Sequence, residues 1–215
     1  MTYLELVNAV LRRLRETEVS TVSENAYSAL IGDFINDSKS RIENSWDWSA
    51  LRTTLSVATS TGVFNYALTG SQNNIKILDV INDTSNFFMV YKTSSWMNNV
   101  FLNSEPASSS PLYYSFNGVN SNGDTLVDLY PIPNGAYDLR FNSILRTPDL
   151  VQDTDILTVP SRPVIHAALA LAARERGETG GTSTPEYFAM AETYLSDAIA
   201  LDANRHPEEL IFREV

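Results

Sequence analysis

Residues 160–173, PSRPVIHAALALAA, are the stretch that decides the fold of this chain. Pro160 and Pro163 suit the first turn of a helix, because proline lacks the amide hydrogen that a helix start leaves unpaired. From Val164 to Ala173 the stretch is almost wholly apolar and rich in alanine. Such a helix is covered on most of its sides and packs closely against its neighbours. The sequence therefore predicts the central helix of a bundle.

Three further helices with an apolar face are predicted near the two ends of the chain. The first runs from Thr2, a predicted N-cap with Glu5 three residues later, to about Glu16, and the second from residue 23 or 24 to about 45. Their apolar faces are formed by Tyr3, Leu4, Val7, Val10, Leu11 and Leu14, and by Tyr27, Leu30, Ile31, Phe34, Ile35, Ile42 and Trp46. A fourth helix is predicted from about Thr184 to Ala203. Because these faces have to be buried, we expect the two chain ends to meet in one bundle.

The middle of the chain has the character of β-structure and is rich in Ser, Thr and Asn. Seven strands are predicted, at residues 53–58, 63–68, 75–81, 87–91, 112–116, 125–130 and 137–145. Turn signals such as Asn117-Gly118 and Asn122-Gly123 separate them. The expected fold class is α+β, with a helical bundle formed by both chain ends and an inserted antiparallel β-sandwich or barrel-like domain.

The expected domain division follows from these elements. Residues 1–50 hold the first two helices, residues 51–148 form the β-rich insertion, residues 149–203 hold the last two helices, and residues 204–215 form a docking tail. The tail contains Pro207 and the apolar trio Leu210, Ile211 and Phe212 among charged residues, which suits docking onto another chain.

Aromatic residues mark two places where packing and binding roles compete. Trp46 and Trp48 extend the apolar face of the second helix, so a packing role is favoured over a sugar-stacking platform. Residues 94–102 predict a short helix with Trp96, Met97, Val100 and Phe101 on one side. It either covers the sheet or projects as an adhesive loop, and we favour the first because free apolar patches are uncommon on soluble monomers.

Composition excludes several classes of protein. A net charge of −11, with no basic region, disfavours a conventional nucleic-acid binder. The absence of cysteine excludes disulfides, thiolate metal sites and cysteine nucleophiles. No long apolar run and no signal-peptide pattern are present, so we expect a soluble chain. Arginine dominates the 15 basic residues, which is a weak indication of protein interfaces.

No catalytic template is present. The sequence lacks the HExxH, GxSxG, Walker and dinucleotide-binding motifs. His166 lies in the apolar third helix, where a hydrogen-bonded packing role is favoured over catalysis, and His206 lies forty residues later. Asp149, Asp153 and Asp155 lack the calcium-loop glycine and terminal glutamate, so we interpret them as a solvated connection and expect no metal site and no cofactor.

Three stretches resemble a known family, the head-to-tail adaptor proteins of short-tailed bacteriophages, also called tail tubular protein A. They are YLELVN (3–8) with LRRL (11–14), IGDFIN (31–36) running on to WDWSALR (46–52), and residues 160–177 with 187–195. The resemblance covers both helical ends, and the β insertion matches in position and composition. Proteins of that family are structural and form a twelve-fold ring beneath the portal, with a six-fold nozzle attached below. The resemblance implies a homo-oligomeric ring in the virion, assembled in the host bacterial cytoplasm, around a channel through which DNA passes.

The resemblance also implies roles for particular residues. Portal binding is expected in the tail, at Arg205, His206, Pro207, Leu210, Ile211 and Phe212. The ring seam is expected at Arg12, Arg13 and Arg174, although the placement of Arg12 and Arg13 in the last helical turn also suits ordinary dipole electrostatics. Contact with the nozzle or with tail fibres is expected at Trp96, Met97 and Phe101.

Two other classes of function stay open on the sequence alone. The β region as a carbohydrate or receptor-binding module predicts a groove lined by Trp96, Tyr113 and Tyr114. An enzyme of unknown class predicts carboxylates with perturbed pKa values in a cleft.

Overall fold

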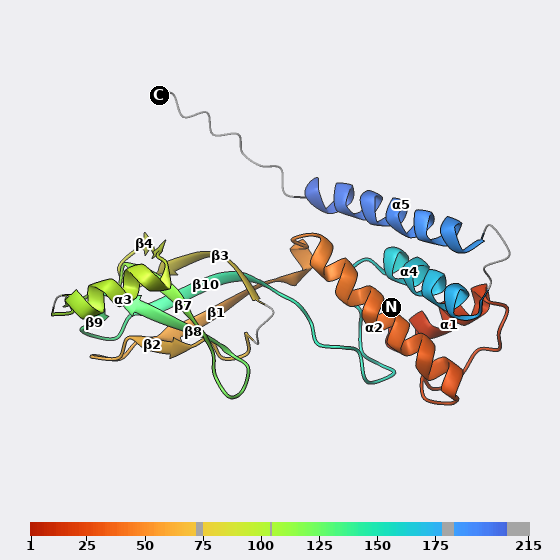
Figure 1. Ribbon diagram of the computed structural model, residues 1–215, viewed down its shortest axis with the longest axis horizontal. Helices are drawn as coiled ribbons and strands as arrows, with labels where there is room; N and C mark the ends of the chain where they lie inside the picture. Colours follow the sequence, from red (N-terminus) through yellow and green to blue (C-terminus); the bar gives the residue numbers. More distant parts are fainter. Residues whose placement is uncertain (72–74, 104, 178–182, 206–215) are drawn as a thin grey trace, which may run out of the picture. The chain divides into compact units, whose positions relative to one another are not determined.

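The protein divides into two compact units, one helical and one built of β-strands. A computed structural model describes residues 1–71, 75–103, 105–177 and 183–205 (Figure 1). The helical unit comprises residues 1–51 and 147–215, and the β unit comprises residues 52–146. Helices from both chain ends pack together and β-sheets are inserted between them in the sequence, so the predicted α+β fold class is confirmed.

Helix α4 is the centre of the helical unit. The unit contains helices α1 (Tyr3–Arg13), α2 (Ala26–Ser45), η1 (Ser49–Leu51), α4 (Ser161–Glu175) and α5 (Ser183–Ala203). Helix α4 contacts α1, α2 and α5. Its alanines allow this close approach, and Ala168, Ala170, Ala172 and Ala173 are fully buried. The central position predicted from residues 160–173 is therefore confirmed.

The ends of α1 and α2 are defined by local hydrogen bonds. Thr2 and Glu5 form the predicted capping box, since Thr2 Oγ1 accepts from Glu5 N at 3.2 Å and Glu5 Oε2 accepts from Thr2 N at 2.9 Å. Helix α1 ends at Arg13, earlier than predicted, because Arg15 adopts a positive φ of 59°. Helix α2 begins later than predicted, because Asn25 caps it by accepting from Ser28 N at 2.8 Å.

Helices α1 and α2 approach closely at Gly32. A Cβ atom at this position would lie 2.3 Å from Tyr3 Oη and 3.0 Å from Val22 Cγ1, so the contact requires glycine. Tyr3 is itself buried, and burial together with the nearby Asp33, Asp149 and Asp153 raises its pKa to about 12. The phenol therefore stays neutral in this contact at physiological pH.

The N-terminus is paired with the segment that follows the β unit. Thr2 and Ile156 form an isolated antiparallel bridge, Tyr3 N donates to Asp155 O at 2.8 Å, and Leu157 N donates to Met1 O at 3.1 Å. Residues more than 150 positions apart are thus joined at the start of α1.

Within the residues that the structure describes, the strands of the β unit form two four-stranded sheets and one short pair. The first sheet has the order β1 (Arg52–Ala58), β10 (Asp138–Leu145), β3 (Ile75–Asn82) and β4 (Phe87–Phe88). The second has the order β2 (Asn65–Ala67), β8 (Thr125–Tyr130), β7 (Tyr113–Val119) and β5 (Val90–Tyr91). Strands β6 (Ser108–Ser109) and β9 (Ile132–Pro133) form the pair. Arg52 lies opposite Ile144, so the unit begins and ends at neighbouring positions of one ladder.

The core of the β unit lies between its two four-stranded sheets. Val80, Leu139 and Phe141 from the first sheet are buried in one cluster with Tyr114, Val127 and Leu129 from the second. Apolar side chains from both inner faces thus interdigitate, as in a sandwich.

The connectivity departs from the sequence prediction in two respects. The predicted strand at 87–91 is split at buried Met89, whose N–H donates to Val80 O at 2.8 Å, and its halves β4 and β5 belong to different sheets. The β5–β7 and β6–β9 pairs are parallel, whereas the expected sandwich was antiparallel throughout. Strands of two residues carry no alternation, which is why β6 and β9 were not predicted.

Helix α3 (Ser94–Asn103) confirms the short helix expected at 94–102. It packs against β7, and the side chain of its own Met97 is fully buried. The helix thus covers the sheet, as the favoured interpretation held.

Candidate assembly surfaces

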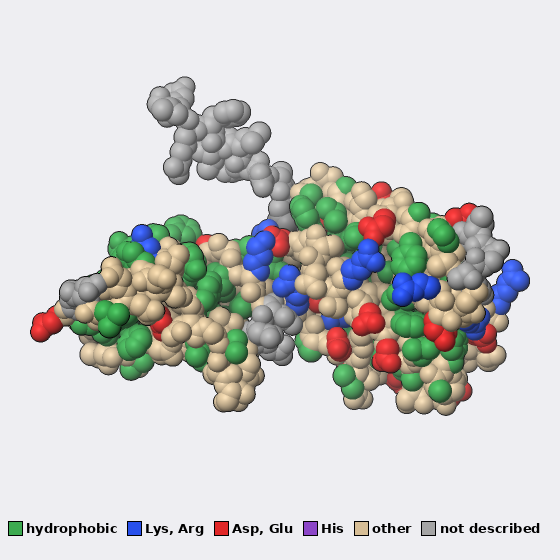
Figure 2. Space-filling model, viewed as in Figure 1, with side chains coloured by type: hydrophobic (Ala, Val, Ile, Leu, Met, Phe, Trp, Pro, Cys, Tyr) green, Lys and Arg blue, Asp and Glu red, His purple; other side chains and the backbone are tan. Residues whose placement is uncertain are grey.

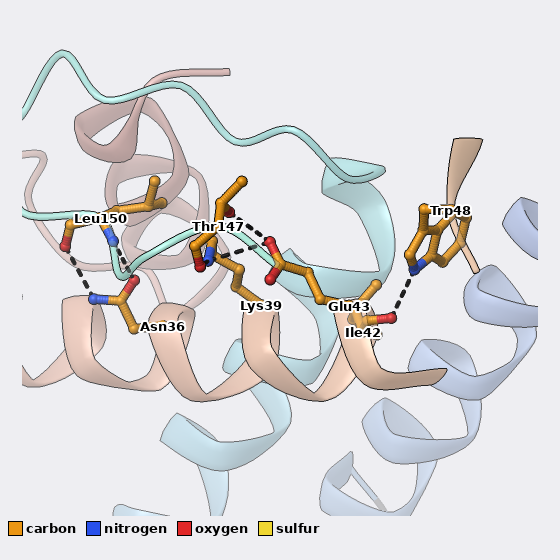
Figure 3. Close-up of polar contacts among 7 residues, drawn as sticks. All are labelled: Asn36, Lys39, Ile42, Glu43, Trp48, Thr147 and Leu150. Carbon is orange, nitrogen blue, oxygen red and sulfur yellow. Dashed lines mark hydrogen bonds and ion pairs between the residues drawn. The ribbon is translucent and has the colours of Figure 1, made fainter. Parts of the chain in front are cut away.

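A buried ion pair fixes the chain where it returns from the β unit (Figure 3). Lys39 and Glu43 of α2 have side chains only 1% and 2% exposed, and Lys39 Nζ lies 3.2 Å from Glu43 Oε1. Thr147 completes the arrangement, since its carbonyl accepts from Lys39 Nζ at 2.7 Å and its hydroxyl donates to Glu43 Oε1 at 2.7 Å. Charges this deeply buried need partners, because desolvation otherwise costs several kcal/mol per ion.

A second polar contact holds the same returning segment one turn earlier on α2. Asn36 Nδ2 donates to Leu150 O at 3.0 Å, and Asn36 Oδ1 accepts from Leu150 N at 2.9 Å (Figure 3). The side-chain amide therefore pairs with the backbone as a neighbouring strand would. Together with Lys39 and Glu43, it sets the register of residues 147–150 along α2.

Sequence reasoning missed the ion pair, although a signal was present. Lys39 lies four residues after Ile35 and three before Ile42, on the buried face of α2. A lysine at that spacing faces inward, and the glutamate four residues later is its natural partner.

The segment that leaves α2 is tied to α5 through Asp202. Asp202 accepts hydrogen bonds from Ser49 Oγ at 2.5 Å, Ser49 N at 3.0 Å and Trp46 Nε1 at 3.2 Å. Burial alone would raise the pKa of Asp202, but the hydrogen bonds from Ser49 and Trp46, with the charge of Arg205, lower it. The carboxylate is thus kept ionised as a structural acceptor.

The two tryptophans of this segment have different environments. Trp48 is 1% exposed and its Nε1 donates to Ile42 O at 2.8 Å, so it packs inside the helical unit (Figure 3). Trp46 is 38% exposed and is held by Asp202. These environments support the packing role over a sugar-stacking platform.

The three arginines expected at a ring seam lie in the last turns of two helices, Arg12 and Arg13 in α1 and Arg174 in α4. Arg176, just after α4, forms an ion pair with Glu16, just after α1, so the last turns of the two helices are neighbours. Arg12 pairs with Glu18 at 2.9 Å, Arg13 Nη1 donates to Ala9 O at 2.6 Å, and Arg174 is exposed. Arg12 and Arg13 therefore already have acceptors within the chain, as expected for residues that stabilise a helix end.

Helix α3 carries the residues expected to contact a nozzle or fibres. Met97 is buried, which leaves Trp96 and Phe101 as the accessible members of the predicted trio. Lys92 Nζ lies 5.3 Å from the centre of the Trp96 ring and 5.2 Å from that of Tyr113. This cation–π arrangement holds the indole against the sheet.

The groove predicted for a glycan is not assembled. Tyr113 lies beside Trp96 with ring centres 5.0 Å apart, whereas Tyr114 is buried and its ring contacts Phe141 in the core. Successive residues of a strand point to opposite faces of the sheet. The three aromatic residues therefore cannot line one groove, and this prediction was wrong.

The carboxylates and the histidine of the helical unit have structural surroundings. Asp155 accepts from Val151 N and Gln152 N, both at 2.7 Å, and these bonds lower its pKa. Asp153 accepts from Val22 N at 3.0 Å. Within residues 1–71, 75–103, 105–177 and 183–205, no three His, Asp or Glu side chains are grouped so as to hold a metal ion.

His166 stacks on Tyr194 with ring centres 4.6 Å apart. Burial, together with the positive charges of Arg13 and Arg162, lowers the pKa of His166. The ring is thus kept neutral within the packing of α4 and α5. Its buried Nδ1 has no hydrogen-bond partner among the described residues, so His166 packs by stacking and not through the hydrogen bond that was expected of this atom.

Of the tail residues expected to bind a portal, Arg205 is described and is exposed. His206, Pro207, Leu210, Ile211 and Phe212 lie outside the described residues. Among the helices that are described, none is both long and apolar enough to cross a membrane.

Comparison with known protein families gives a match over almost the whole chain. The family described as SU10 adaptor protein matches residues 1–209, which include both units. No curated protein matches the chain.

Proposed function

Because the chain belongs to the SU10 adaptor protein family, a structural family of phage head-to-tail adaptors, we propose that it joins the portal to the tail nozzle as a ring. The observation that carries this proposal is the family match across residues 1–209, which spans the helical unit and the β unit together. The proposed mechanism is geometric, since each subunit presents the same surfaces around a channel. Side-by-side contacts between identical subunits are heterologous and close into a ring when the rotation permits, with twelve copies proposed here.

The proposed ring also forms part of the DNA channel in the virion, after assembly in the host cytoplasm. The net charge of −11 supports this role, because a negative lining repels phosphate and lets DNA slide. A basic lining would retain the DNA through counterion release.

The proposed seam involves Arg12 and Arg13 in the last turn of α1 and Arg174 in the last turn of α4. Arg174 is the strongest candidate, because it is exposed, whereas Arg12 and Arg13 already bond to Glu18 and Ala9. An acidic group on the neighbouring subunit would give it a charge-assisted contact. On the β unit, Trp96 and Phe101 are proposed to face the nozzle or fibres, and the tail from Arg205 to Phe212 is proposed to enter portal clefts.

The first test is negative-stain electron microscopy of the purified protein mixed with portal rings. A twelve-fold collar on the portal is the expected result. Free protein beside bare portals would overturn the adaptor proposal for this partner, because attachment to the portal is its central claim.

The seam is tested by Arg174→Glu in the same experiment. We expect charge reversal to reduce collar formation at least tenfold, since it places like charges across the contact. Arg140→Glu is the matched control, because Arg140 lies in the β unit with a similarly exposed side chain. Equal collar formation by both variants would exclude Arg174 from the seam.

A further inference from the structure

An apolar groove opens in the helical unit beside the C-terminal end of α5. It has a volume of about 300 Å³ and is lined on its apolar side by Trp48, Ala50, Val159, Pro160, Ala198 and Leu201. Thr158, Asp202 and Arg205 complete its lining. Leu201 is 62% exposed, although the side chains beside it in the groove are largely apolar. The groove thus leaves apolar surface in water.

The described chain stops at this groove. Arg205 is the last described residue and is part of the lining. Ten residues follow it, and their one apolar run is Leu210-Ile211-Phe212. Since each residue spans at most about 3.5 Å, Leu210 can reach any point within roughly 17 Å of Arg205.

We propose that the groove binds Leu210, Ile211 and Phe212 of its own chain, so that the docking tail is covered until a portal displaces it. The occupant is argued from the position of Arg205, since a segment tethered at the mouth of a groove has an effective concentration in the millimolar range. A tail from a second copy would have to bind without that advantage. The inference rests on the proposed function only in naming the portal as the competitor.

The test uses a fluorescent peptide of residues 206–215 and two full-length proteins. In one protein the trio is replaced by Leu210→Ser, Ile211→Ser and Phe212→Ser, which empties the groove without altering a described residue. Fluorescence anisotropy should show peptide binding to this variant, and binding at least tenfold weaker to the unaltered protein, whose own tail competes. Equal binding to the two proteins would overturn the proposal, because the groove would then be open in its own chain.

A pair of substitutions on α5 locates the binding. Leu201→Asp, added to the tail variant, should abolish peptide binding because it places a charge in the groove. Met190→Asp is the matched control, since Met190 is also exposed on α5 but lies eleven residues, or about 16 Å, away along the helix. Circular dichroism checks that both variants are folded. Loss of binding in both variants, or in neither, would overturn the assignment to the groove.

The same peptide is then offered to purified portal rings, which separates this inference from the proposed function. Binding to the portal without binding to the groove would overturn the inference and support the adaptor role. Binding to the groove without binding to the portal would support self-docking and count against the tail as the portal contact.

Discussion

The contacts that stabilise the interior of the helical unit differ in kind from those that stabilise the interior of the β unit. Charged side chains join distant segments of the helical unit, as Arg41 does with Glu192 at 2.5 Å and Arg176 does with Glu16. In the β unit, ring contacts connect α3 to the sheet and one sheet to the other, as Trp96 does with Tyr130 and Tyr114 with Phe141. On the face shown in Figure 2, charged side chains are frequent over the helices and sparse over the β unit.

The difference follows from how each unit sets the register of its segments. Strands are aligned by their backbone ladders, so their side chains are free to be apolar or aromatic. The backbone groups of a helix are hydrogen-bonded within the helix itself. Only side chains can therefore align a helix with the segment that packs against it. In the helical unit, the polar bonds of Lys39, Glu43 and Asn36 align residues 147–150 along α2, and those of Asp202 tie the segment after α2 to α5. This predicts that the two units respond to different substitutions.

The largest effect is expected from Phe141→Ala in the β unit. Phe141 is buried between the sheets, and such a truncation costs about 4 kcal/mol of the free energy of unfolding. Hydrogen exchange followed by mass spectrometry should show lost protection in residues 52–146 and unchanged protection in the helical unit. Phe88→Ala is the control, because Phe88 is exposed. An equal loss of protection in both units would show that they unfold together, which would contradict the separate responses expected of the two units.

Lys39→Met is expected to have the next largest effect, confined to the helical unit. It leaves Glu43 buried without its cation, which costs about 3 kcal/mol, measured by urea unfolding. The double variant Lys39→Met, Glu43→Leu should recover most of this loss, since an apolar pair leaves no unpaired charge. Arg41→Met on the same helix is the control, because its ion pair with Glu192 is exposed and contributes under about 1 kcal/mol. A cost no greater than that of Arg41→Met would show that the buried pair is dispensable.

Gly32→Ala is expected to destabilise the helical unit by about 2 kcal/mol, although alanine is the better helix former. The added Cβ would lie 2.3 Å from Tyr3 Oη, and the buried ring has little room to move. Thermal unfolding by circular dichroism measures the loss. Ser40→Ala, at an exposed position of α2, should leave stability unchanged or slightly raised. Similar melting temperatures for the two variants would argue against a tight α1–α2 contact.

The smallest effect is expected from acid. The pKa of Asp202 is lowered in the folded protein, so its contribution to stability is present above the unfolded-state value of about 4 and is lost as the pH falls through the lower folded value. The urea midpoint of the helical unit should therefore fall more steeply below about pH 4 in the unaltered protein than in Asp202→Asn. Asp83→Asn in the β unit serves as control. If the urea midpoints of all three proteins depended on pH in the same way, Asp202 would not contribute to the loss of stability in acid.

Much of the fold could be predicted from periodicity, and less of the candidate site. The spacing of Tyr3, Val7 and Val10 and the alanines of α4 predicted which faces are buried, because burial follows from the periodic pattern itself. Strands β1, β3 and β10 alternate along most of their length and were predicted nearly to their ends, whereas β8 was predicted to its ends although its burial does not alternate. The break at Met89, where the chain passes from the first four-stranded sheet to the second, could not be predicted. The sequence does not show which sheet each half of a strand joins.

The contacts made by individual polar residues depended on partners distant in the sequence. Lys39 faces Thr147 and Ser49 faces Asp202, and no local pattern connects either pair. Tyr113 and Tyr114 were grouped in one predicted groove because both are aromatic, but alternation along β7 separates them. Strand alternation was the signal that could have corrected this prediction.

The pairing of the N-terminus with residues 155–157 has a consequence for synthesis. Tyr3 N donates to Asp155 O, so α1 cannot reach its final partner until about 150 further residues have left the ribosome. At 5–20 residues per second this takes roughly 8–30 s. Residues 52–146, by contrast, form a contiguous unit that is complete before α4 emerges. The surface of α1 that packs against α4 therefore stays uncovered throughout that interval, although α1 can already pack against α2, and this makes the nascent chain a natural client for a chaperone that binds early.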